Sequence, residues 1–199
     1  MVVPEDSDIE SAADLAGATV EINTLNNISD TVIRETVRAD GGDEEAVEFV
    51  EMAFPDMPAA LEAGNVDAVF VVEPFLSITR NAGARPVTWP YAEADEDLEV
   101  AVYFTSEETA QSDPELIESF TNAMVASQEL ATSDEEKLRA IPTAYTEIDE
   151  ALLADLTFPR FTSEVSEASA QGLADPAVSP RVPPGWRSGP PGTPSPAQR

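Results

Sequence analysis

The sequence predicts an α/β fold built on a sheet of parallel strands. Short apolar segments alternate with segments of helical periodicity through the first hundred residues. Residues 66–72 form a nearly continuous apolar run, which is typical of a strand covered by helices on both faces. Glycine and proline stand between these segments, where helices and strands stop. The pattern therefore predicts successive strand–helix units, with one strand lying beside the next.

Each element of the first half has its own local signal. The expected elements are strand 19–22, helix 29–39, strand 47–52, a helix between 56 and 64, strand 66–72, a helix between 74 and 83, and strands 86–89 and 100–104. Val32, Ile33 and Val37 give the first helix one apolar side, and a glycine pair follows it. Asp56 is expected to cap the second helix.

The second half of the chain predicts helices without strands. Asp113 followed by Pro114 is a cap with a first-turn proline, and apolar residues then recur at helical spacing as far as Ala131. Ser133 and Glu136 match a capping box, with further helices expected at 147–154 and 163–173. These helices have apolar faces but no expected sheet to cover them. We expect exposure at Leu116, Ile117, Phe120, Met124, Leu138, Ile141 and Leu152, and an unstable or aggregation-prone chain.

Residues 176–199 differ in composition from everything before them. They hold 8 of the 17 prolines and three arginines, but no Asp or Glu. Such a segment cannot bury enough apolar surface to order itself, so we expect a disordered Pro-rich tail. A ligand for a partner domain and a reading-frame accident are alternative explanations of the same composition.

Composition excludes several classes of function. The 10 Lys and Arg against 39 Asp and Glu give a net charge of −29, which argues against nucleic acid and anionic membrane surfaces as partners. A solvated acidic surface accounts for this charge. The chain has no His and no Cys, so Ser-His and Cys-His catalysis and thiolate zinc sites are excluded. We predict no catalytic residue, no metal site and no cofactor.

No targeting or membrane segment is expected in the chain. Residues 1–6 lack the basic and apolar regions of a signal peptide. No apolar run is long enough to cross a bilayer, so we predict no direct membrane insertion.

Polar residues follow the first predicted strand at its carboxyl end. Asn23, Thr24, Asn26 and Asn27 occupy the loop between strand 19–22 and the helix after it. Ligands of open α/β sheets bind at such loops, where amide side chains and helix N–H groups meet a polar head group. We predict that these four residues bind a ligand. Capping of the helix by Asn26 or Asn27 is an equally strong interpretation.

A second group of candidate ligand contacts follows the other strands. Glu73 ends the apolar run and suits an amine or amidine donor, although an acid at a helix N-terminus is an equal alternative. Phe54 and Phe75 are predicted to form an apolar or stacking wall. Core packing is the more common fate of either ring.

Four segments together resemble a known family. They are residues 14–20, the Asn-Thr-Leu-Asn-Asn loop at 23–27, the helix that leads into Gly-Asn-Val-Asp-Ala at 64–68, and Val-Glu-Pro-Phe at 72–75. Over about residues 10 to 175 the chain is similar to the substrate-binding proteins of ABC importers in the sulfonate, nitrate, taurine and thiamine-pyrimidine group (SsuA/THI5-like, NMT1-like).

The resemblance implies a type II periplasmic-binding-protein fold that closes over a small molecule between two lobes and delivers it to ABC permease transmembrane subunits. Residues 1–13 would be a remnant of the first lobe or hinge, and 14–99 the second ligand-binding lobe. Residues 100–175 would be a return strand with the C-terminal helices of the first lobe. The start of the first lobe is expected to be missing before Met1, so that this chain is a fragment.

The same resemblance implies where the intact parent acts and what it binds. It would be periplasmic, or extracellular at the cell surface as a lipoprotein, and its ligand would be a sulfonate, taurine, nitrate or an aminopyrimidine. Two alternatives remain open: the effector-binding domain of a transcriptional regulator, and a THI5-like pyrimidine-precursor synthase. The absence of His and Cys disfavours the synthase.

Overall fold

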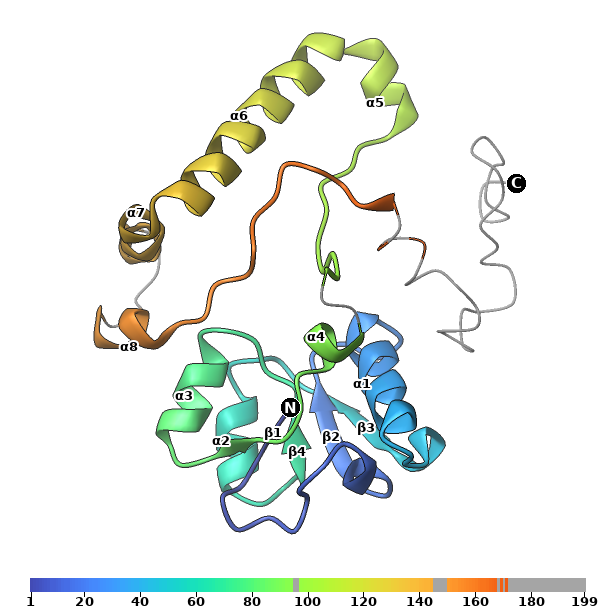
Figure 1. The fold of residues 1–199 in the computed structure, drawn as a ribbon. Helices are drawn as coiled ribbons and strands as arrows, with labels where there is room; N and C mark the ends of the chain where they lie inside the picture. Colours follow the sequence, from blue (N-terminus) through green and yellow to red (C-terminus); the bar gives the residue numbers. More distant parts are fainter. Residues whose placement is uncertain (95–96, 145–149, 168, 170, 172–199) are drawn as a thin grey trace.

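The protein has an α/β layer formed by its first half and a set of helices formed by its second half (Figure 1). The computed structural model describes residues 1–94, 97–144, 150–167, 169 and 171. The expected tail at 176–199 lies outside these residues, as do parts of the helices expected at 147–154 and 163–173. The predicted α/β class is confirmed.

Five strands form the sheet, in the order β3-β2-β4-β1-β5. They are β1 (Val2–Val3), β2 (Thr19–Ile22), β3 (Glu48–Glu51), β4 (Ala68–Val69) and β5 (Arg85–Pro86). Strand β2 runs parallel to β3 and β4, whereas β1 runs antiparallel to β4 and β5. The sheet is therefore mixed, and the expected parallel arrangement holds only for its β3-β2-β4 part.

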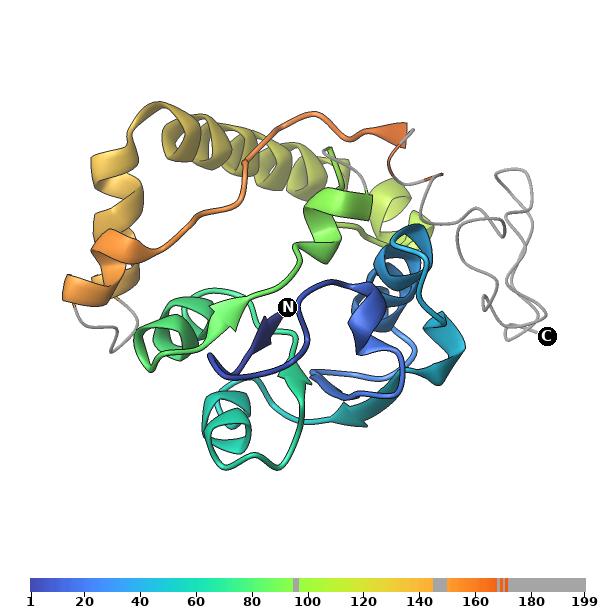
Figure 2. The same ribbon diagram turned by 60° about the horizontal axis from the view of Figure 1, so that its bottom comes forward.

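Helices cover both faces of the sheet. Helices α1 (Ile28–Ala39) and α4 (Pro90–Ala94) lie over one face, and α2 (Met57–Glu62) and α3 (Phe75–Asn81) over the other (Figure 2). Short 3-10 helices, Ala13–Leu15 and Glu44–Ala46, lead into β2 and β3. Two apolar clusters result. Val20, Ile33 and Val37 belong to the first, and Met57, Leu61 and Val69 to the second.

Most of the expected elements of this layer are confirmed, with three corrections. Strand 19–22 and helix 29–39 appear at the expected places, and Gly41 has a φ of +87° after α1. Asp56 precedes α2 but its side chain makes no capping hydrogen bond, because the residue is already helical at φ −91° and ψ −21°. The run at 66–72 is buried except at exposed Asp67 and half-buried Val72, yet only Ala68–Val69 have strand geometry. The strand expected at 86–89 is Arg85–Pro86.

Helices follow one another through the second half, as expected. They are α5 (Glu107–Ser112), α6 (Pro114–Ser133), α7 (Glu135–Ala140), the 3-10 helix Ile141–Ala144 and α8 (Glu150–Asp155). Asp113 caps α6, because its Oδ1 accepts the N–H of Leu116 at 3.0 Å. The capping box predicted for Ser133 and Glu136 is wrong. Ser133 ends α6, and Asp134 caps α7 through the N–H of Lys137.

The strand predicted at 100–104 is also wrong. These residues belong to no strand of the structure, and Phe104 is 92% exposed. The outer strands of the described sheet, β3 and β5, do not pair with this segment, so its backbone gains no ladder. Helix α6 buries none of its residues. Of the seven apolar residues expected to be exposed, Leu116, Phe120 and Ile141 are exposed, whereas the other four are half-buried: Ile117, Met124, Leu138 and Leu152. Among the described residues no helix is long and apolar enough to cross a membrane.

Candidate functional site

The carboxyl ends of three parallel strands meet at one edge of the sheet. β2 lies between β3 and β4, so the loops after β2 and β4 are neighbours there. All seven residues predicted to bind a ligand follow one of these strands. The topology therefore brings them to the same edge, which is where open α/β sheets bind ligands.

The loop after β2 holds four of these residues in different environments. Asn23 is half-buried, and its Oδ1 accepts the hydroxyl of Ser29 at 3.1 Å. Thr24 is exposed, and its hydroxyl has no hydrogen bond to any residue that the structure describes. Asn26 is exposed in the left-handed region at φ +57°, which asparagine tolerates better than most residues. Thr24 and Asn26 therefore present free polar side chains.

Asn27 and Asp30 form a capping box at the start of α1. The Oδ1 of Asn27 accepts the N–H of Ile28 at 2.6 Å. Asp30 accepts the N–H groups of Asn26 and Asn27 at 3.0 Å and 2.9 Å. The capping interpretation of Asn27 thus describes its bonds within the protein. Because Asp30 takes two backbone donors beside the helix N-terminus, an anion at this position would meet a carboxylate rather than free N–H groups.

Glu73 lies at the start of α3 with hydrogen bonds to both carboxylate oxygens. Its Oε2 accepts the N–H of Ser77 at 3.0 Å. Its Oε1 accepts the Ser77 hydroxyl at 3.0 Å and the N–H of Thr157 at 3.1 Å. Glu73 therefore accepts hydrogen bonds at the N-terminus of α3, as we predicted in the alternative interpretation. Two carboxylate oxygens offer about four acceptor positions, so three bonds leave room for one more donor.

The two phenylalanines form a pair on the α2 and α3 face. Their ring centroids are 6.2 Å apart and their planes differ by 16°, so the rings are stacked. Both rings are half-buried and pack against the second apolar cluster. The structure brings Phe54 and Phe75 together near Glu73, while Asn23 and the asparagines that follow it lead into α1 on the other face.

Sequence reasoning missed Ser29 and Asp30, and it did not predict the contacts that Tyr91 makes. Buried Ser29 bonds Asn23 and also Tyr91, whose ring packs edge-on against Phe70 at 5.1 Å. Burial raises the pKa of the Tyr91 phenol, and the hydrogen bond to Ser29 opposes that rise in part. An asparagine three residues before an aspartate resembles a capping box, so the Asn27 and Asp30 pair had a sequence signal. The Tyr91 contact had none.

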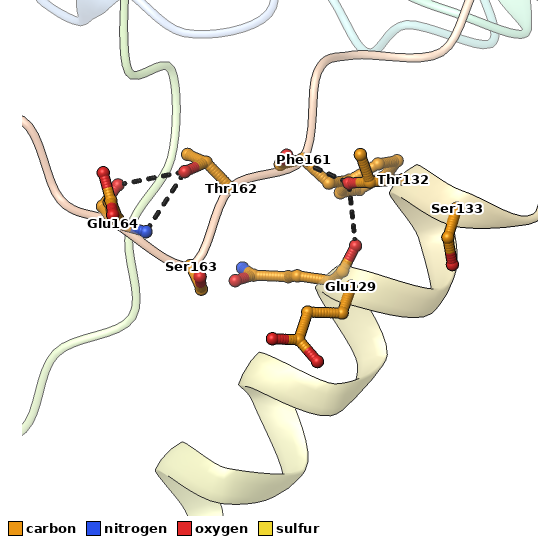
Figure 3. Close-up of a pocket in the computed structure, with 8 residues that line it drawn as sticks. Glu129, Thr132, Ser133, Phe161, Thr162, Ser163 and Glu164 are labelled. Atoms are coloured by element: carbon orange, nitrogen blue, oxygen red, sulfur yellow. Dashed lines mark hydrogen bonds between the residues drawn. The ribbon is translucent and has the colours of Figure 1, made fainter.

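A hollow of about 460 Å³ lies elsewhere, between α6 and the segment that follows α8 (Figure 3). Gln128, Glu129, Thr132, Ser133 and residues 161–164 line it. The Thr132 hydroxyl donates to the carbonyl of Phe161 at 3.2 Å, and Thr162 and Glu164 bond each other across the turn. Most of these side chains are exposed, and no predicted site residue is among them. The hollow is a solvent-exposed groove between two segments, not a place where buried polar groups converge.

Within the described part of the chain, no group of three or more carboxylates is placed to hold a metal ion. The edge that carries the predicted residues therefore offers hydrogen-bonding side chains and an aromatic pair.

The fold matches several solved structures. The periplasmic aliphatic sulphonate binding protein SsuA from Escherichia coli matches with a TM-score of 0.70 at 20% identity, over 87% of this chain and 60% of that chain. The alkanesulfonate-binding protein SsuA from Xanthomonas axonopodis pv. citri, bound to MOPS, matches with the same TM-score at 16% identity, over 87% of this chain and 60% of that chain. The desulfurization enzyme DSZB matches with a TM-score of 0.61 at 18% identity, over 86% of this chain and 65% of that chain.

At these identities the matches establish the fold, which is that of type II periplasmic binding proteins. The chain spans only 60% of the length of either SsuA structure. Comparison with curated proteins gives no match. A model of the family described as NMT1/THI5 like matches residues 1–138, more than half of the chain. The chain therefore belongs to the NMT1/THI5-like family.

Proposed function

We propose that this chain is part of the ligand-binding component of an ABC importer, and that it binds a small polar organic molecule at the carboxyl edge of β2, β3 and β4. The observation that carries the proposal is that the free polar side chains of Thr24 and Asn26 and the stacked rings of Phe54 and Phe75 all follow strands that end at this edge. A few placed polar groups beside an apolar wall are the usual composition of a small-molecule site.

Family membership supports the proposal. The SsuA structures that share the fold are binding proteins for sulfonates, and one holds the sulfonate buffer MOPS. The parent protein would place its ligand between this lobe and a second one, work outside the cytoplasmic membrane, and hand the ligand to permease subunits. DSZB shares the fold and is an enzyme. Because this chain has no His or Cys, we propose binding without chemistry.

Local charge distinguishes among the ligand classes. Asp30 occupies the backbone donors at the start of α1, and Glu73 has one acceptor position left. Both carboxylates disfavour an anionic group at the carboxyl edge of the sheet and favour a donor such as an amine. Of the four classes, taurine and aminopyrimidines carry such a donor, and nitrate does not. We therefore expect an amine of the ligand to face this lobe.

Thermal shift of the full chain tests the proposal. The ligands are taurine, ethanesulfonate, nitrate and an aminopyrimidine. A ligand at 100 times its Kd stabilises by about 2.7 kcal/mol, so even weak binding is visible at high concentration. We expect taurine or the aminopyrimidine to raise Tm more than ethanesulfonate or nitrate. If none of them raises Tm, these four classes are wrong for this chain.

Two variants locate the binding site. Asn26→Gly removes the side chain at a position where glycine adopts the positive φ without strain, so stability is kept while the ligand contact is lost. Asn81→Ala changes an exposed asparagine at the C-terminal end of α3, away from the carboxyl edge of the strands, and is the matched control. We expect the ligand-induced shift to fall at least threefold in Asn26→Gly and to stay unchanged in Asn81→Ala. Equal shifts in both variants would place the ligand elsewhere.

A further inference from the structure

The second half of the chain touches the α/β layer at the end of α8. Figures 1 and 2 both show α8 beside α3, and the two helices are in contact. Leu153 and Leu156 are only 6% and 5% exposed, in a half of the chain whose longest helix, α6, buries nothing. The end of α8 is therefore anchored more firmly than the helices before it.

The layer holds the end of α8 through Glu73 and Ser77. The N–H of Thr157 donates to Oε1 of Glu73 at 3.1 Å. The Ser77 hydroxyl lies 3.0 Å from the same oxygen and 3.5 Å from the carbonyl of Asp155, so its one hydrogen is shared between them. A charged acceptor makes the Thr157 bond stronger than one between neutral groups.

Helix α7 holds the same turn through Arg139. Its guanidinium donates to the carbonyls of Leu153 and Leu156 at 2.7 Å and 3.2 Å, which are groups that a helix end leaves without partners. The guanidinium also lies 5.3 Å from the ring centre of Phe158. Within α7, Glu135 fixes the arginine at 2.8 Å. One short turn of chain is thus bound by an acid of the layer and by a base of the helical half.

Three further contacts join residues 97–99, which follow α4, to the segment after α8. Arg160 pairs with Asp97, the N–H of Ser166 donates to Glu99 at 2.6 Å, and the N–H of Glu99 donates to the hydroxyl of Ser169 at 2.9 Å. Leu98, between Asp97 and Glu99, packs against the first apolar cluster, so these contacts tie the segment after α8 to the α1 and α4 face and not to α3. The attachment of α8 to the layer rests on the Glu73 and Ser77 contacts and on the buried leucines.

We propose that the last turn of α8 is the pivot between the helices α5–α7 and the α/β layer. Glu73 and Arg139 are the two residues whose hydrogen bonds hold this turn in place. Glu73 is then a positioning residue that fixes the angle between the two halves. This role is independent of the ligand, since three intraprotein bonds define it. A ligand donor that took the remaining acceptor position of Glu73 would act directly on the pivot.

Hydrogen exchange of the full chain, followed by mass spectrometry, tests the pivot. In Glu73→Ala we expect peptides covering residues 150–161 to exchange at least tenfold faster, while peptides of β2 and α1 keep their rates. Glu73→Gln keeps one acceptor oxygen, so exchange at residues 150–161 should be faster than in the parent chain and slower than in Glu73→Ala. The matched control is Glu51→Ala, which removes a carboxylate at the same edge that accepts the N–H of Leu25 at 2.9 Å. It should speed exchange only near residue 25.

Thr157→Pro keeps the experiment decisive if Glu73→Ala unfolds the layer. Proline removes the single donor to Glu73 from a residue outside the layer. We expect the same fast exchange at 150–161, with the amide of Ser77 still protected. Rates at 150–161 within twofold of the parent chain, in either variant with a folded layer, would overturn the proposal. A ligand-binding loss in Glu73→Gln with unchanged exchange would also overturn it, since Glu73 would then be only a ligand contact.

Discussion

At the scale of single residues, Glu21 is the most unusual feature of the layer. It stands in β2, an inner strand of the sheet, in register with Val50 and Val69 on its two neighbours, and is only 1% exposed. Its Oε2 has no hydrogen-bond partner among the residues that the structure describes. Burial without compensation raises the pKa of this carboxyl above its ordinary value of 4.5.

A raised pKa makes stability depend on pH in a defined direction. The folded chain holds the Glu21 proton more tightly than the unfolded chain. The contribution of protonated Glu21 to the free energy of unfolding is therefore complete below pH 4.5, and it is lost as pH rises through the raised pKa. At pH 7 the Glu21→Gln variant should be more stable by about 1 kcal/mol, or roughly 2–4 °C in Tm. The difference between variant and parent should shrink toward pH 4. Melting curves from pH 4 to pH 8 measure it, and a constant difference would contradict the burial argument.

The capping pair at α1 is a second prediction at this scale. Asn27→Ala removes the cap and should cost about 1 kcal/mol without any ligand present. Urea unfolding of the ligand-free chain measures the change. Thr24→Ala is the control, because its hydroxyl has no partner among the described residues, and it should leave stability within about 0.5 kcal/mol. Equal effects of the two substitutions would mean that Asn27 does not cap the helix.

At the scale of elements, the turn after α1 depends on Gly42. A Cβ there would lie 2.7 Å from the Cα of Ala13 and 2.8 Å from the Cγ1 of Val37. Two backbone segments and a buried valine would have to move, and overpacking of this kind costs about 1–3 kcal/mol. We expect Gly42→Ala to lower the midpoint of urea unfolding without changing the slope. An unchanged midpoint would mean that the segments separate freely.

Local signals predicted the elements whose ends are marked by capping residues or glycine. Helix α1, with its apolar side at Val32, Ile33 and Val37, and the cap of α6 at Asp113 follow from sequence alone. The strand at 100–104 does not, because its apolar residues fit a strand only if another strand pairs with them. Strand β1 was missed for the opposite reason: two residues are too short for a pattern, and β4 and β5 create the strand by pairing with it.

The candidate site shows the same division. Positions at the carboxyl edge were predictable from strand order, since parallel neighbours end together. The sequence did not predict which of the side chains at this edge stay free of hydrogen bonds. The second acceptor role of Glu73 depends on Thr157, 84 residues away, and no local pattern contains that contact.

At the scale of the whole molecule, stability is unevenly distributed. Both apolar clusters lie within residues 1–98, whereas α6 exposes Leu116 and Phe120. Large side chains left in water forgo roughly 1.5–3 kcal/mol each. We expect α5 and α6 to exchange amide hydrogens at least a hundredfold faster than β2 and β4. Hydrogen exchange of the parent chain measures this ratio, and equal protection in the two halves would contradict the uneven core.

The central claim is that a small polar ligand binds at the carboxyl edge of β2, β3 and β4. Backbone amide chemical shifts of the isotope-labelled full chain, titrated with taurine and an aminopyrimidine, test it most directly, because they detect weak binding and show which residues the ligand contacts. We predict saturable shifts at residues 23–30 and 73–77, and none along the groove between α6 and residues 161–164. Shifts confined to that groove, or no saturable shift with either ligand, would contradict the account.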